Sequence, residues 1–239
     1  MTSDLRAQLS THSNNKRTKY FDLSEQHRDW KLARETINGK RFYVTPEGNK
    51  YPSVTTVLST MNARAINEWR ATVGEQEANR ISTQASTRGT QVHAIAEKYL
   101  QNDDQYAAGA MPANIVTFNQ IKQFLDTHCG KVYANEISLY SDRLRAAGQC
   151  DLVADIDGVR SIGDFKTAKR HKREDWITNY FYQCTAYAIM LHEREQVWCP
   201  QICIMIATDE DGLQTFIRQT DDFLDSVYDY FNNYHKNIL

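Results

Sequence analysis

Hydrophobic positions in the first half of the chain repeat with the period of an α-helix. Over 88–101 they lie three and four residues apart on one stripe, formed by Val92, Ile95, Ala96, Tyr99 and Leu100. A second stripe over 114–128 is formed by Ile115, Phe118, Ile121, Phe124 and Leu125. The more polar stretch 62–87 also has helical character. The pattern therefore predicts helices over 62–87, 88–101 and 114–128.

The segment ahead of these helices combines strand and turn signals. Residues 41–45 and 50–51 flank Pro46-Glu47-Gly48-Asn49, which predicts a hairpin. The next run, 52–58, is rich in β-branched residues, as a strand would be. Ser53 could instead cap a helix in which the apolar side chains of this run share a face. We favour the helix and keep the strand as the alternative.

The period changes to two in the second half. Residues 132–136 alternate between apolar and polar positions, and the alternation continues to Tyr140. Asp157-Gly158 and Asp211-Gly212 are tight-turn signals. The pattern predicts helices over 174–194 and 221–234 and strands over 132–140, 150–156, 159–167, 202–207 and 213–219.

These elements predict an α/β fold with a central mixed sheet flanked by helices. Residues 1–18 lack a regular apolar pattern and are interpreted as a flexible arm. Residues 19–239 are interpreted as one domain, with a helical N-terminal half over 52–128 and a sheet with further helices over 131–239.

Composition narrows the class of protein. The 239 residues include 28 Lys+Arg and 30 Asp+Glu, a formal net charge of -2, so bulk positive charge cannot drive binding to nucleic acid. No apolar run approaches the roughly 18 residues of a membrane span, and we expect no membrane partner. The N-terminus lacks the apolar core of a secretory signal, although its Arg, Lys and Ser content leaves a transit peptide as an alternative. The five cysteines lack metal-binding spacing, which favours reduced thiols and a cytoplasmic location.

Candidate chemistry centres on two neighbouring strands. Asp164 and Lys166 are two residues apart and project from the same face of their strand. A hairpin through Asp157-Gly158 brings Asp151 beside them. Two clustered carboxylates repel each other unless a divalent cation neutralises them, and oxygen ligands favour Mg²⁺ or Mn²⁺. The ordinary alternative for this trio is a cross-strand salt bridge.

Several other residues could join this chemistry, although each alone has an ordinary structural interpretation. Glu136 precedes the hairpin, and His93 lies beside the apolar stripe of its helix. Gln183 and Tyr187 share a helix face and could contact a phosphate and a base. A basic run follows the strand that carries Asp164 and Lys166, and it contains Lys169, Arg170, Lys172 and Arg173. It could neutralise a nucleic-acid backbone, or it could be a solvated loop.

Taken in order, these motifs resemble the RecB-like branch of the PD-(D/E)xK nucleases. The likeness is greatest to mitochondrial genome maintenance exonucleases and related phage exonucleases, and it covers about residues 41–190. The matching pieces are the segment 51–58, Gly89-Thr90 with His93, Glu136 before Tyr140-Ser141, Gly148 with Asp151, Asp164-Phe165-Lys166-Thr167, and Gln183 with Tyr187.

The resemblance implies a restriction-endonuclease-like core and specific residue roles. It implies metal coordination by His93, Asp151, Asp164 and the backbone carbonyl of Phe165. Lys166 matches the catalytic lysine, and Glu136 lies close to the metal. The DNA-contacting positions match Ser53, Thr55, Gln183 and Tyr187. The cysteines that hold an iron–sulfur cluster in some relatives have no counterpart, so no cluster is expected.

The sequence thus predicts a Mg²⁺- or Mn²⁺-dependent deoxyribonuclease acting as an exonuclease on single-stranded DNA ends, in replication, recombination or repair. The expected partners are single-stranded DNA and replication or recombination proteins, and a monomer is expected. A structure-selective endonuclease of the same fold is one alternative. A DNA-binding scaffold with a decayed site is another.

Overall fold

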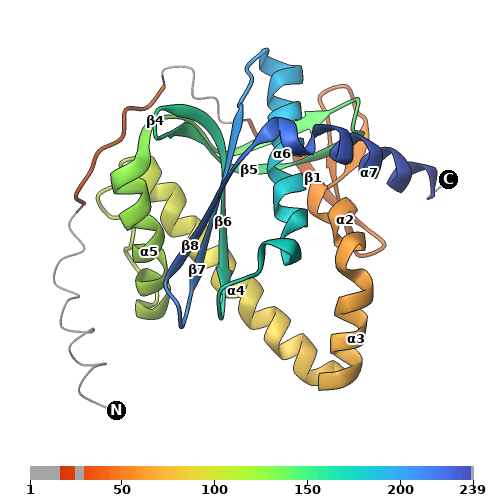
Figure 1. Cartoon of the computed structure of the whole chain (residues 1–239), viewed down its shortest axis with the longest axis horizontal. Coiled ribbons are helices and arrows are strands. Elements are labelled where there is room, and N and C mark those ends of the chain that lie inside the picture. Colours follow the sequence, from red (N-terminus) through yellow and green to blue (C-terminus); the bar gives the residue numbers. More distant parts are fainter. Residues whose placement is uncertain (1–16, 25–29, 238–239) are drawn as a thin grey trace.

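A computed structural model describes residues 17–24 and 30–237 (Figure 1). Its strands are β1 (Ala33–Ile37), β2 (Lys40–Val44), β3 (Lys50–Pro52), β4 (Cys129–Ser141), β5 (Ala146–Ile156), β6 (Val159–Ala168), β7 (Gln201–Thr208) and β8 (Leu213–Gln219). Its α-helices are α2 (Val54–Leu58), α3 (Ala63–Val73), α4 (Glu75–Leu100), α5 (Pro112–His128), α6 (Thr178–Glu195) and α7 (Leu224–Lys236). Short 3₁₀ turns lie at η2 (Ser59–Asn62), η3 (Glu174–Trp176) and η4 (Thr220–Phe223).

The predicted α/β class is confirmed. A five-stranded sheet in the order β4-β5-β6-β7-β8 has one parallel pair, β6 with β7, and three antiparallel pairs. Helices α4 and α5 cover one face and α6 covers the other (Figure 1). Each face buries its own apolar cluster, centred on Phe118 and Phe165 on the α4 side and on Ile204 and Met190 on the α6 side.

A second, three-stranded sheet precedes the helices. Strands β1, β2 and β3 pair antiparallel, and an isolated bridge between Ser53 and Ala147 joins this sheet to β5. The hairpin predicted around 46–49 is present, whereas β1 was missed because its residues are largely exposed. Ser53 caps α2 by accepting a hydrogen bond from the Thr56 amide, so the helical interpretation of 53–58 is confirmed.

Helix boundaries differ from the prediction in one instructive place. The predicted boundary between two helices, 62–87 and 88–101, is wrong, because α4 runs unbroken from Glu75 to Leu100. The break falls at Gly74, whose φ of 84° ends α3 and starts α4. The arm predicted over 1–18 lies outside the described residues except for Arg17 and Thr18. Arg17 donates to the Tyr99 carbonyl at the end of α4.

No helix in the described part of the chain has both the length and the apolar character needed to cross a bilayer.

The pairing of β5 with β6 depends on the absence of a side chain at Gly163. A Cβ there would lie 3.0 Å from Leu152 Cδ2 and 3.1 Å from Leu152 Cβ. We expect Gly163→Ala to lower the free energy of unfolding by about 1–3 kcal/mol, because the core would be overpacked. Urea unfolding measures this change. Gly130→Ala is the matched control, since its added Cβ would make an ordinary 3.5 Å contact; an equal loss in both variants would contradict the packing argument.

Candidate active site

The site begins where two strands of the large sheet separate. The ladder between β5 and β6 ends at the pair Leu152–Gly163, so β5 offers no backbone partner to Phe165 farther along β6. The Asp151 carboxylate provides the missing acceptor, since its Oδ2 accepts a 2.9 Å hydrogen bond from the Phe165 amide. Asp151 is held rigidly by this contact and by its burial at 7% exposure.

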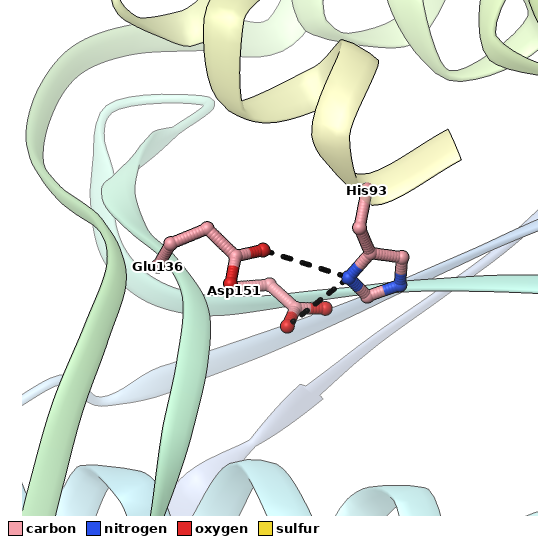
Figure 2. Close-up of side chains that lie close together, drawn as sticks. All are labelled: His93, Glu136 and Asp151. Carbon is pink, nitrogen blue, oxygen red and sulfur yellow. Dashed lines mark ion pairs between the residues drawn. The ribbon is translucent and has the colours of Figure 1, made fainter. Parts of the chain in front are cut away.

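His93 reaches the same point from α4. Its Nε2 lies 2.8 Å from the Phe165 carbonyl oxygen, which can only accept, so Nε2 carries a proton. The other ring nitrogen, Nδ1, therefore points at the carboxylates of Asp151 and Glu136 (Figure 2). The separations are 3.5 Å to Asp151 Oδ1 and 3.6 Å to Glu136 Oε1.

Glu136 occupies an unusual backbone conformation within β4. Its φ of 50° lies in the left-handed region, which is sparsely populated by residues other than glycine. Its side chain lies beside Asp151, and both carboxylates face His93 of α4 (Figure 2). Such outliers persist where the surroundings impose them, and they gather at functional sites.

Asp164 lies in a neighbouring polar cluster rather than in the His93 group. Its carboxylate is 1% exposed, forms an ion pair with the Lys166 ammonium, and accepts a 2.8 Å hydrogen bond from Gln183 Nε2. The Tyr180 ring faces the same ammonium, with its centroid 5.1 Å from Lys166 Nζ. Gln183 thus binds the acid itself in this structure, and α6 holds the pair in place.

The charges of the site pull its pKa values in different directions. Burial raises the pKa of Asp164 to about 6, since the Lys166 charge only partly offsets the desolvation. Burial also acts on Asp151, but the His93 and Lys166 charges outweigh it and lower the pKa of that carboxyl. Burial disfavours the charged form of His93, yet Asp151 and Glu136 raise its pKa well above the usual range. The acids therefore need nearby positive charge to be ionised together.

These residues fit a divalent metal ion. His93, Glu136 and Asp151 each offer one donor atom, and the three atoms lie within 4.8 Å of one another. Ligands about 2.1 Å from a shared ion are at most about 4.2 Å apart, so small side-chain movements would complete the geometry. The mixed nitrogen and oxygen donors suit Mn²⁺ as well as Mg²⁺. The Phe165 carbonyl and Asp164 lie beside the group, with their polar atoms engaged by His93 and Lys166.

The group opens into a cavity of about 560 Å³. Predicted residues that line it include Ser53, Thr55, Lys166, Gln183 and Tyr187. Tyr187 packs tightly against the sheet, because a Cβ at Gly148 would lie 2.7 Å from its hydroxyl oxygen. The structure thus brings motifs from α2, α4, β5, β6 and α6 around one space.

Part of the cavity lining was missed by the sequence analysis. It contains Arg34 and Arg41 from the small sheet, together with Tyr43. Asn179 and Tyr180 at the start of α6 were also missed. The signal available was the alternation in β2, which places Arg41 and Tyr43 on one face of the predicted hairpin.

The basic run lies away from this cavity. Lys169, Arg170 and Lys172 do not line it. Arg170 pairs with Glu210 at 2.5 Å, Lys169 approaches the same carboxylate at 4.0 Å, and the Lys172 amide binds Gln214. Arg170 and Lys169 therefore lie in charge-compensated surface contacts. The five cysteines are free and buried in the two apolar clusters.

Comparisons with known proteins find only distant likenesses. No family model and no curated protein matches the chain. A solved structure of a candidate exonuclease from Eubacterium rectale is similar over 62% of this chain and 66% of its own, with 14% identity and a TM-score of 0.38. The structure of SSO0001 is similar over 62% of this chain and 70% of its own, with 10% identity and a TM-score of 0.32. The chain thus spans just under two thirds of the first structure, and likenesses this remote assign no function.

Replacing His93 tests the metal assignment directly. We expect His93→Ala to weaken Mn²⁺ binding about tenfold or more, because one donor is lost and two carboxylates are left facing each other. In the native chain, affinity should rise as the pH rises through the His93 pKa, since the Nδ1 proton competes with the ion. Calorimetric titration measures both effects. His128→Ala, which removes a surface histidine paired with Asp157, is the control; equal affinity in the two variants would exclude His93 as a ligand.

Proposed function

We propose that the chain is a metal-dependent deoxyribonuclease that hydrolyses phosphodiester bonds. The observation that carries the proposal is the His93–Glu136–Asp151 donor group beside the buried Asp164–Lys166 pair, in a cavity that Arg34 and Arg41 also line. The cavity lining thus offers donor atoms for a cation and arginine side chains for a polyanion, which is the combination that a phosphodiester substrate requires.

Each residue then has a stated task. A divalent ion, when bound, would polarise the scissile phosphate and lower the pKa of a water molecule. Lys166, fixed by Asp164 and facing Tyr180, would orient that water or stabilise negative charge developing on the phosphate. Gln183 would keep Asp164 aligned. Tyr187 and the hydroxyls of Ser53 and Thr55 would contact the bound strand.

The exonuclease form of the proposal rests on how the cavity is built. Both the N-terminal elements, which include the small sheet, α2 and α4, and the large sheet with α6 contribute residues to the lining of the cavity. A strand in the site would thus run between the two halves of the chain, and this favours a single strand that threads from a free end. Action as a cytoplasmic monomer, with replication or recombination proteins as partners, belongs to the same proposal.

Asp164→Asn should abolish cleavage of end-labelled single-stranded DNA, because the variant keeps the shape of the side chain but loses its charge beside Lys166. A chelator should do the same to the native chain, and DNA binding should persist in both. Asp155→Asn, in the same sheet and bonded to Tyr133, should remain active. Full cleavage by Asp164→Asn would refute the assignment, while a native chain that binds DNA without cleaving it would favour the scaffold alternative.

The need for an end is tested separately. With metal present, linear single-stranded DNA should be degraded, and the same sequence closed into a circle should resist, since threading requires a free end. Gel analysis of labelled strands over time measures both rates. Degradation of the intact circle at a comparable rate would replace the exonuclease by the endonuclease alternative.

A further inference from the structure

Two hollows that share one lining residue lie outside the cavity, between α7 and the small sheet. The first, of about 470 Å³, is lined by Lys40, Thr60, Tyr230, Asn233, Tyr234 and Asn237. The second, of about 260 Å³, shares Tyr234 and is also lined by Phe42, Tyr51, Lys50 and Arg145. We call the two together the α7 groove. Figure 1 shows the end of α7 beside α2 and the small sheet.

The α7 groove and the cavity have lining residues that are neighbours in the chain. Arg41 and Ser59 line the cavity, and their chain neighbours Lys40 and Thr60 line the first hollow. Side chains alternate along β2, so Lys40 and Arg41 project from opposite faces of the strand. The cavity and the first hollow are therefore neighbouring spaces with β2 between them.

Two contacts fix α7 in this position. The Tyr230 hydroxyl lies 2.6 Å from Thr60 Oγ1, and His235 Nε2 donates a 3.1 Å hydrogen bond to the Leu144 carbonyl. The strands on the other side of the α7 groove are also fixed, because β2 pairs with β3 and places Phe42 opposite Pro52. The α7 groove is thus built from anchored elements.

The chemistry of the α7 groove is that of a site for single-stranded nucleic acid. Four half-buried aromatic rings, Phe42, Tyr51, Tyr230 and Tyr234, line it. Stacking on such rings binds bases of any sequence. Asn233 and Asn237 add amide groups that can hydrogen-bond bases or phosphates.

Charge in the α7 groove also favours a polyanion. Among the described residues that line it, none is Asp or Glu. Lys40 and Arg145 form no ion pair within the described part of the chain, whereas Lys50 pairs with Glu35 at 2.7 Å. In a chain of net charge -2, a lining with cations and no acids is a local departure from the average.

We propose that the α7 groove binds the part of a DNA single strand that lies outside the cavity. The proposal rests on the proposed nuclease function, and it adds a second binding segment that holds the substrate while its end is processed. Stacking and phosphate contacts there would strengthen the binding of long strands, whereas a strand short enough to fill the cavity alone would gain nothing.

The test compares binding with catalysis. Binding of an oligo-dT strand of about 30 nucleotides is measured by fluorescence anisotropy in chelator, and cleavage of one of about 6 nucleotides at saturation is measured with metal. Tyr234→Ala should weaken long-strand binding about fivefold or more. Lys40→Ala should lower the slope of log affinity against log salt by about 0.7. Neither should change the short-strand cleavage rate.

A matched pair of variants controls for folding. Asn233→Asp places a carboxylate in the α7 groove with no change of shape and should weaken long-strand binding. Asn232→Asp adds the same charge to an exposed neighbour that does not line the groove, and it should bind as the native chain does. An equal loss in both would assign the effect to the charge of α7 as a whole and would overturn the proposal.

The remaining outcomes separate the two proposals. Unchanged long-strand binding in Tyr234→Ala and Lys40→Ala would overturn the α7 groove as a DNA site and leave it to a protein partner. A native chain that cleaves neither strand, but loses long-strand binding in these variants, would refute the nuclease function while supporting the α7 groove.

Discussion

The site depends on the backbone amide and carbonyl groups of Phe165. Because β5 separates from β6 beyond Leu152–Gly163, the Phe165 amide and carbonyl have no partner on the neighbouring strand. Asp151 satisfies the amide and His93 satisfies the carbonyl. Two functional side chains are therefore fixed by the same requirement that stabilises any sheet, namely that buried polar groups be paired. Phe165 is 1% exposed, and the burial of its ring in the apolar cluster on the α4 side holds this part of the backbone in place.

This arrangement sets the electrostatics of everything around it. Asp151, fixed by the backbone, faces Glu136, and both are drawn to the single positive charge that His93 can carry. Asp164 is paired instead with Lys166, and its pKa of about 6 reflects burial that this pair does not fully offset. The site thus holds three carboxylates close together, and the positive charges of His93 and Lys166 between them reduce their mutual repulsion. A bound divalent ion would relieve the same repulsion more completely than a proton on His93 does.

Much of this could be predicted from local pattern. The spacing of Asp164 and Lys166 placed them on one strand face, the turn at Asp157-Gly158 placed Asp151 alongside, and Ser53 marked the start of α2. The backbone of Glu136 could not be predicted, because its φ of 50° has no signal in the residue itself. The partner of Arg170 was equally hidden, since Glu210 lies 40 residues away in sequence. The wall with Arg34 escaped because an exposed short strand has no apolar alternation to reveal it.

The small sheet carries cationic side chains on both of its faces, although the net charge of the chain is -2. Alternation along β2 sends Arg41 and Tyr43 into the cavity and Phe42 to the other face, where α7 closes over it. One thin element therefore separates two spaces and contributes to both. The acids that line the cavity come from the large sheet and α4, whereas Arg34, Arg41 and Lys40 of the small sheet form no ion pair among the described residues. Arg34 and Arg41 of the small sheet thus balance part of the negative charge that Glu97, Glu136 and Asp151 bring to the cavity lining.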